Sequence, residues 1–363
     1  MKVFLCAILV SLMLVETGIG GENLNPLLVN QPPGTWLKLE TKGDKRPRNI
    51  HDHAGVALDP ENSVLHYFGS DTHNQDWNND VWSLDVVSLM WTQSYEPDKR
   101  ITYQFKDGCR STRNGRPWCM HTFALNAWDP VGKRLLVSSQ PIHYGLEELP
   151  QVTMPNNPKG CWWEYDPVEG LWTSITNGPE LGLGHLCYVP TQKYFIAFNG
   201  RNEAVALYDP HVKLIEHLKF SDGPLPNGYT LKSAYDVKRD RILLISWNTE
   251  SRLWAFDLKT MRWKDLKTAN TPVSGIYGSW DYDAYADMIV SLWSENPEGG
   301  FSNKSGKSRT FLCDLEKNIW IEHKTELTAP YTGMSYKMVY DPRHKVTLYL
   351  AGLDLWSFKA PTH

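Results

Sequence analysis

The stretch GVALDPENSVLHYFG, residues 55–69, places two short apolar segments on either side of an Asp-Pro turn. Alternating apolar residues around such a turn predict an antiparallel hairpin. The same phrase returns along the chain with the turn residues at a constant place, so it is an internal repeat. Further copies cover residues 125–139, 186–200, 233–247, 280–293 and 337–352.

A second hairpin of its own kind follows most copies, as in DVWSLDVVSLMWTQ, residues 80–93. Four antiparallel strands with a Trp at the outermost one describe a propeller blade, and the Asp-Val-Trp-x-Leu-Asp phrase resembles Kelch repeats. Six blades are clear, and a seventh could lie within 93–125 or 140–160. The last copy lacks its outer strand, which TWLKLE (residues 35–40) can supply and so remove the open edge. We therefore expect an all-β, Kelch-like propeller of six or seven blades, closed by its N-terminal strand.

The ends of the chain predict its location. Met1 and Lys2 precede an apolar run over 3–15 and then small residues, the layout of a secretory signal peptide over 1–20. We expect a linker over 21–33 and the propeller over 34–363. A net charge of −4 argues against a nucleic-acid-binding surface, and no later apolar run is long enough to span a membrane. The expected protein is a secreted monomer with no nucleic-acid or membrane partner.

Five cysteines remain once Cys6 leaves with the signal peptide, and an odd number means that at least one is not in an internal disulfide. Cys109 and Cys119, ten residues apart, could close a disulfide. The mature cysteines are Cys109, Cys119, Cys161, Cys187 and Cys313.

The loops of a four-stranded blade alternate between the two ends of the propeller. The Asp-Pro turns share one end, so the entry into the first strand and the connection between the second and third strands share the other. Irregular loops on a rigid scaffold are where binding sites are expected. This phase places five polar residues together on neighbouring blades: His121, His143, His185, Tyr188 and Arg201.

The segment that leads to His121 is basic, with six Lys or Arg between residues 99 and 116 against Asp107 alone. A local charge of +5 on a protein of net −4 indicates an anionic ligand, although a solvated basic loop is the alternative. Candidate substrate-binding residues here are Arg110, Arg113 and Arg116 together with His185. The same phase places three aromatic residues where they could stack on sugars or pack between blades: Trp247, Tyr277 and Trp293.

Two histidines, a tyrosine and an arginine suit the elimination of a 4-linked uronic acid. A base must remove the C5 proton, a cation must offset the carboxylate, and the departing O4 needs a proton. His, Arg and Tyr can perform these tasks.

A secreted propeller with this quartet in this order resembles the seven-bladed ulvan lyases, which cleave sulfated, uronate-containing polysaccharide by β-elimination. The resemblance favours seven blades. It implies catalytic roles for His121 and Tyr188 in proton transfer and for His143 and Arg201 in binding the uronate. The expected function is a polysaccharide lyase acting on an anionic polysaccharide, most simply ulvan.

No cofactor is required for this chemistry. A structural zinc or calcium ion could bind His51, His53 and a thiol such as Cys187, although no ligand spacing is diagnostic. Two other functions stay open. A non-catalytic propeller would bind a glycan or protein, and a propeller glycoside hydrolase would need two carboxylates that face the sugar, with Asp71, Asp76 and Glu295 in suitable loops.

Overall fold

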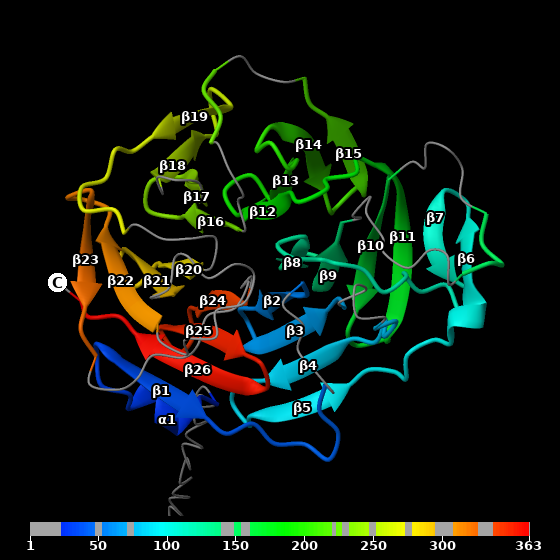
Figure 1. Cartoon of the computed structure of the whole chain (residues 1–363), viewed down its shortest axis with the longest axis horizontal. Coiled ribbons are helices and arrows are strands. Elements are labelled where there is room, and N and C mark those ends of the chain that lie inside the picture. The colour runs from blue at the N-terminus through cyan, green and yellow to red at the C-terminus, as the bar shows by residue number, and fades with distance from the viewer. Residues whose placement is uncertain are drawn as a thin grey trace, which may run out of the picture.

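The computed structural model describes residues 23–47, 53–70, 76–138, 149–153, 160–219, 223–226, 232–246, 252–272, 278–294, 308–325 and 337–362. Six four-stranded antiparallel sheets stand around a central axis (Figure 1), which confirms the predicted all-β propeller. No helix in the described ranges is long and apolar enough to cross a bilayer.

The blades follow one another in chain order. The first blade contains β2 (Gly55–Asp59), β3 (Val64–Phe68), β4 (Trp82–Asp85) and β5 (Met90–Gln93). The second contains β8 (Asn126–Asp129), β9 (Arg134–Val137), β10 (Gly160–Asp166) and β11 (Leu171–Gly178). The third contains β12 (His185–Val189), β13 (Tyr194–Phe198), β14 (Ala204–Asp209) and β15 (Leu214–His217). The next two are β16 (Ser233–Asp236), β17 (Arg241–Ser246), β18 (Arg252–Asp257), β19 (Arg262–Asp265); and β20 (Gly278–Asp283), β21 (Met288–Ser294), β22 (Ser308–Asp314), β23 (Ile319–His323). The sixth contains β24 (Met338–Asp341), β25 (Val346–Ala351), β26 (Asp354–Lys359) and β1 (Thr35–Leu39).

The ring closes with six blades. The first strand of each blade contacts the first strands of both neighbours, and β24 contacts β2, which leaves no place for the seventh blade that the resemblance favoured. The segment between β5 and β8 instead forms a 3-10 turn, η2 (Arg100–Thr102), and a two-stranded hairpin of β6 (Tyr103–Lys106) and β7 (Cys109–Thr112).

The N-terminal strand closes the ring as predicted. β1 pairs antiparallel with β26, with Trp36 opposite Phe358. The segment expected as a linker is folded where it is described. It contains the short helix α1 (Pro26–Val29), whose Leu28 side chain is fully buried. The side chain of Gln31 donates to Ser357 O at 3.0 Å and so ties this segment to β26.

The hydrophobic core lies in layers between neighbouring blades. One layer joins Leu65 and Leu84 of the β2–β5 blade to Leu348 and Leu355 of the β24–β26 blade. The outer-strand tryptophans belong to these layers, because Trp91, Trp263 and Trp320 are buried and Trp172 packs against a buried cluster. Burial of large aromatic rings contributes most of the blade-to-blade adhesion.

In five of the six repeats an Asp stabilises the turn, and Val189 stands at the equivalent position of the remaining one. In the β2–β3 turn, Asp59 Oδ1 accepts hydrogen bonds from the backbone N–H groups of Glu61 at 3.0 Å and Asn62 at 3.4 Å. Ser63 then adopts a left-handed conformation with φ of 53°. The β8–β9 turn repeats both features, with Asp129 bound by Val131 N and Lys133 at φ 54°. Short side chains that bind their own turn explain why Asp recurs there.

Candidate functional site

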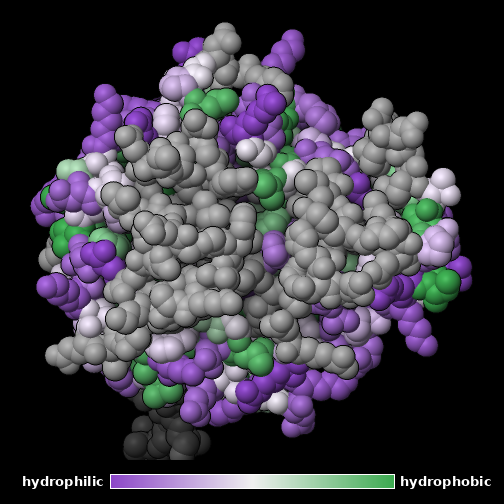
Figure 2. Space-filling model, in the orientation of Figure 1, coloured by the Kyte–Doolittle hydropathy of each residue, from purple (hydrophilic) through white to green (hydrophobic). Residues whose placement is uncertain are grey.

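The two ends of the ring differ in chemistry. The tight Asp turns lie at one end, which we call the turn end, and the connections of variable length lie at the other, the loop end. The outer rim of the loop end is mostly hydrophilic, with scattered apolar side chains (Figure 2). The predicted site residues were expected at this end.

His121 lies at the loop end next to a second histidine, His53, which precedes β2. The two imidazole rings stack with centroids 4.4 Å apart and planes 15° apart. Phe123 presents its ring edge to both. The backbone N–H groups of Thr122 and Phe123 donate to His53 O at 3.0 Å, which fixes the pair across two blades. Only 2% of His121 is exposed.

Tyr188 does not lie beside this pair, and the sequence-based placement was wrong on this point. β12 runs from His185 to Val189, so Tyr188 lies near its turn end and its side chain points to the opposite sheet face from that of His185. The Tyr188 ring packs on Phe195 at 5.0 Å. Burial, and then the carboxylate of Asp129 in the neighbouring turn, raise the pKa of Tyr188.

His185 is a core residue and not a surface contact for substrate. It is completely buried, stacks on Phe198 with centroids 4.6 Å apart, and its Nδ1 shares a 2.8 Å hydrogen bond with Ser233 Oγ. Burial lowers the pKa of His185 to about 3, so the ring is neutral in the folded protein. Arg201 is exposed on the β13–β14 connection, and His143 lies outside the described residues.

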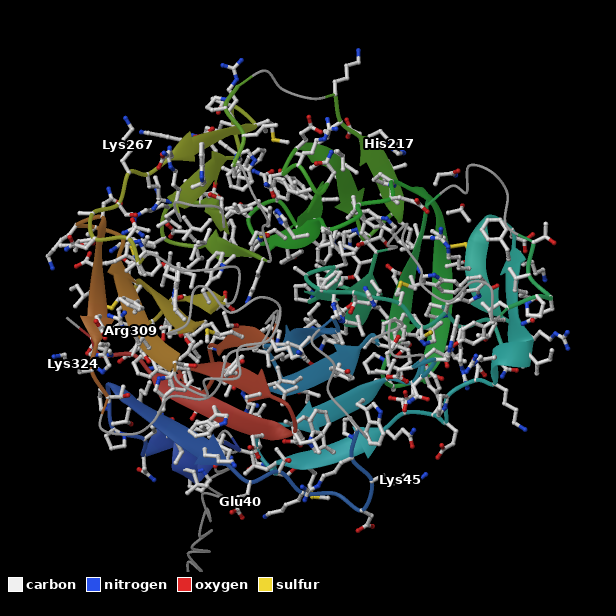
Figure 3. All side chains as sticks on the ribbon, in the orientation of Figure 1. Glu40, Lys45, His217, Lys267, Arg309 and Lys324 are labelled. Atoms are coloured by element: carbon white, nitrogen blue, oxygen red, sulfur yellow. A yellow bond between two sulfur atoms is a disulfide. The ribbon has the colours of Figure 1, made fainter. Side chains whose placement is uncertain are left out.

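The basic segment carries less free charge than its sequence indicates. Arg110 pairs with Glu180 at 3.1 Å, and Arg116 pairs with Asp98 at 3.3 Å. Arg113 is exposed. The disulfide that Cys109 and Cys119 could have formed is absent, because Cys119 is a free thiol. Cys109 is bonded to Cys161 of β10, which ties the β6–β7 hairpin to the next blade (Figure 3), and the free cysteines within the described ranges are Cys119, Cys187 and Cys313.

Trp293 is 1% exposed and stacks edge-on against Trp320, so of its two sequence-based interpretations the structure supports inter-blade packing. The alternation of side chains along β21 points the Trp293 side chain into the core. Trp247 and Tyr277 lie outside the described residues.

The described residues contain no group of three His, Cys, Asp or Glu side chains that could hold a metal ion. His53 stacks on His121, and His51 lies outside the described ranges. Cys187 is buried, and burial raises the pKa of its thiol to about 12, which disfavours the thiolate form that binds metal.

A cleft of about 770 Å³ opens at the loop end of the β2–β5 blade. This volume is within the range of small-molecule sites. Its walls come from three separate parts of the chain: the segment before β2, the β3–β4 connection and the residues after β5. Lys45, labelled in Figure 3, belongs to the first of these. The lining residues include Asp44, Lys45, Arg46, Tyr67, Asp76, Asn78, Asp80, Trp82, Gln93 and Glu96.

The carboxylate of Asp80 is fixed in the cleft by two side-chain hydrogen bonds. Its Oδ2 accepts hydrogen bonds from Trp82 Nε1 and Gln93 Nε2, both at 2.8 Å. Burial raises the pKa of Asp80, and the negative charge of Asp76 raises it further, whereas the two donors oppose the shift. Asp76 itself accepts a 3.1 Å hydrogen bond from Asn78 N. Asp76 and Asp80 therefore share one cleft, whose lining also includes Asp44 and Glu96.

Sequence reasoning placed Asp76 in a suitable loop but found no carboxylate to pair with it. The missed partner, Asp80, stood inside the phrase DVWSLD, which indicated a blade strand. Asp80 and Trp82 are two residues apart, so in an extended chain their side chains lie on the same face. This spacing was the sequence signal that could have identified Asp80.

Comparison with known proteins supports the fold alone. No protein-family model matches the chain, and no curated protein matches it in sequence. Solved structures with similar folds include a protein of unknown function from Bacteroides thetaiotaomicron (TM-score 0.50, 8% identity, covering 84% of this chain and 68% of that one). An auxiliary nutrient binding protein from Bacteroides ovatus gives a TM-score of 0.49 at 9% identity, covering 89% and 76%. Hydrazine synthase of Kuenenia stuttgartiensis gives 0.46 at 10%, covering 85% and 76%.

Proposed function

We propose that the protein is a glycoside hydrolase whose active site is the cleft at the loop end of the β2–β5 blade. The observation that carries this proposal is the presence of Asp76 and Asp80 in one cleft of about 770 Å³. Glycosidases use two carboxyl groups, one as acid and one as base or nucleophile. Polar side chains around them, such as Asn78 and Gln93, suit the hydroxyl groups of a sugar.

The environments of the two carboxyl groups suggest their roles. Asp80 is the general acid, because burial raises its pKa and favours the protonated form. Its Oδ2 already accepts two hydrogen bonds, so Oδ1 is the oxygen that would carry the proton and pass it to the leaving oxygen. Asp76, whose side chain also lines the cleft, is the second carboxyl group.

Substitution of Asp80 tests this assignment. Loss of a general acid lowers the rate by about 10²–10⁴-fold, so Asp80→Asn and Asp76→Asn should lose nearly all release of reducing ends from a panel of polysaccharides. Asp44→Asn is the matched control, because Asp44 lines the same cleft but is exposed. Full activity of Asp80→Asn, or no cleavage of any polymer by the wild type, would refute the proposal.

β-Elimination of an anionic, uronate-containing polysaccharide, with ulvan first among them, is the second candidate function, and the stacked pair of His53 and His121 favours it. Imidazole is a side chain suited to act as a base near neutral pH. Tyr188 is too far along β12 to serve as their acid. The two functions give different products, because elimination creates a double bond that absorbs ultraviolet light and hydrolysis does not. A product that absorbs, with activity lost in His121→Ala and kept in Asp80→Asn, would select the lyase.

A further inference from the structure

The loop that carries the two cleft carboxylates has a second, buried side. Along residues 76–80 the side chains alternate. Asp76, Asn78 and Asp80 line the cleft, whereas Trp77 and Asn79 are buried on the other side. What binds Trp77 and Asn79 therefore sets where the carboxylates stand.

The contacts on that buried side come from the segment that contains the β6–β7 hairpin. Tyr103 Oη donates to Trp77 O at 2.7 Å, and the Tyr103 ring meets the Trp77 ring edge-on. Asn79 Nδ2 donates to Pro117 O at 2.9 Å and to Asp98 Oδ2 at 3.1 Å, and Asp98 N donates back to Asn79 Oδ1 at 2.8 Å. Tyr95 Oη donates to Asn79 O at 2.6 Å.

Asp98 joins this loop to the hairpin itself. Its carboxylate accepts hydrogen bonds from Thr112 Oγ1 in β7 at 2.7 Å and from Arg116 Nη1 at 3.3 Å. Asp98 is 9% exposed, so its hydrogen bonds are shielded from water.

The hairpin in turn is anchored to the neighbouring blade. Cys109, the first residue of β7, forms a disulfide with Cys161 of β10, and the adjacent Arg110 pairs with Glu180 beyond β11. The carboxylate loop of the β2–β5 blade is thus connected, through hydrogen bonds and one covalent bond, to the β8–β11 blade.

We propose that the β6–β7 hairpin, held by the Cys109–Cys161 disulfide, is the positioning element of the cleft and sets the place of Asp76 and Asp80. Opening the disulfide takes up two electrons and two protons from a dithiol reductant and yields two thiols. The hairpin then loses its covalent anchor, the loop loosens and water enters the cleft. The consequence for catalysis rests on the hydrolase proposed above, whereas the positioning of Asp80 does not.

Tyr103→Phe is the variant that tests the inference. It removes the hydroxyl that holds Trp77 O and leaves the ring in place. Tyr208→Phe is the matched control, because it removes one buried tyrosine hydroxyl that binds Glu164, away from the cleft. The double variant Cys109→Ser, Cys161→Ser removes the covalent anchor. Far-ultraviolet circular dichroism establishes that each variant is folded.

The decisive measurement is the titration of the Asp80 carboxyl carbon by ¹³C NMR, assigned with Asp80→Asn, which needs no substrate. We expect the pKa of Asp80 to fall toward its ordinary range in Tyr103→Phe, in the double variant and on reduction of the wild type, and to stay in place in Tyr208→Phe. An unchanged titration in folded Tyr103→Phe, or an equal change in Tyr208→Phe, overturns the inference. Should the double variant not fold, the tyrosine pair decides alone.

Activity separates this inference from the hydrolase proposal. With an active wild type, Tyr103→Phe should lower kcat several-fold and move the pH profile with Asp80, and Tyr208→Phe should leave both unchanged. With a wild type that cleaves no glycan, the hydrolase proposal fails and the Asp80 titration still judges the positioning.

Discussion

The turn end and the loop end of the ring are built from the same six blades but by different rules. At the turn end Asp recurs at most of the equivalent positions, Val189 being an exception, and it binds the backbone of its own turn, as Asp59, Asp166 and Asp257 do. At the loop end the cleft brings together residues from three distant segments. Local, repeated interactions therefore support stability at one end, and unique, non-local ones shape a site at the other.

This contrast predicts that substitutions at the turn end change stability and leave activity intact, whereas substitutions in the cleft do the reverse. Asp80→Asn is the strongest test at the loop end, with its expected loss of about 10²–10⁴-fold in rate. The predictions that follow examine the contrast in order of decreasing effect.

Asp341→Ala should cause the largest loss of stability at the turn end. The buried Asp341 carboxylate accepts hydrogen bonds from His344 Nδ1 at 2.6 Å and Ser63 Oγ at 3.1 Å, and His344 Nε2 accepts from Asn25 N at 3.0 Å. The alanine leaves these buried groups unpaired across the ring closure, so the free energy of unfolding should fall by about 3 kcal/mol.

Urea denaturation measures this effect. Asp354→Ala is the control, because the exposed Asp354–Lys38 pair contributes less than about 1 kcal/mol. Equal losses in the two variants would show that the closure network contributes no more than a surface ion pair.

Asp283→Asn should stabilise the protein, whereas the other substitutions of turn Asp residues should lower its stability. Burial raises the pKa of Asp283 from 3.8 to about 6. The native state therefore holds this proton more tightly than the unfolded state. Stability from Asp283 is full below pH 3.8, falls as the pH rises to about 6 and stays low above it.

The asparagine keeps the acceptor for Tyr285 N and Ala286 N without the buried charge. The free energy of unfolding should rise by about 2 kcal/mol at pH 7, with the gain vanishing near pH 4. Thermal denaturation at several pH values measures it, and a gain that does not depend on pH would contradict the charge as its cause.

The turn end shows how far sequence alone reaches. The Asp turns and outer Trp residues repeat because each blade solves the same local problem, so a single chain reveals the blades, their order and the closing β1. The repeat predicted six or seven blades, a range that includes the six observed, whereas the resemblance favoured seven.

The loop end shows where sequence stops. Tyr188 and His185 are three residues apart, and the length and alternation of β12 send them to different ends and different faces. The Cys109–Cys161 bond joins residues 52 positions apart, and the walls around Asp76 and Asp80 come from three separate parts of the chain, so both depend on contacts that no local pattern contains. His121 lies at the loop end, and its stacking partner His53 had been considered as a metal ligand, a substrate contact or a surface residue, but not as a partner of His121.

Arg46→Ala should change which glycans the cleft accepts. Arg46 is an exposed cation in the cleft wall, whereas its neighbour Lys45 is paired with Glu96. If the cleft hydrolyses glycans, loss of Arg46 should raise KM about tenfold for uronate or sulfated substrates and leave KM for neutral ones unchanged, which corresponds to about 1.4 kcal/mol. Arg113→Ala, an exposed arginine outside the cleft lining, is the control. A KM that rises equally for neutral substrates would show that Arg46 does not select charge.

Asp257→Ala should give the smallest loss of unfolding free energy, because the hydrogen bonds to the Asp257 side chain come from its own turn. Asp257 Oδ1 accepts hydrogen bonds from Thr260 N at 2.7 Å and Lys259 N at 3.1 Å, and the bonds from Thr260 lower the pKa of Asp257. The loss of unfolding free energy should be about 0.5–1 kcal/mol at pH 7.

Because the folded pKa is depressed, this contribution is full above pH 3.8 and disappears as the pH falls through the lower folded value. Denaturation curves at pH 7 and pH 2.5 measure the difference, with Lys259→Ala as the control in the same turn. A loss that persists unchanged at pH 2.5 would mean that the carboxylate charge does not hold the turn.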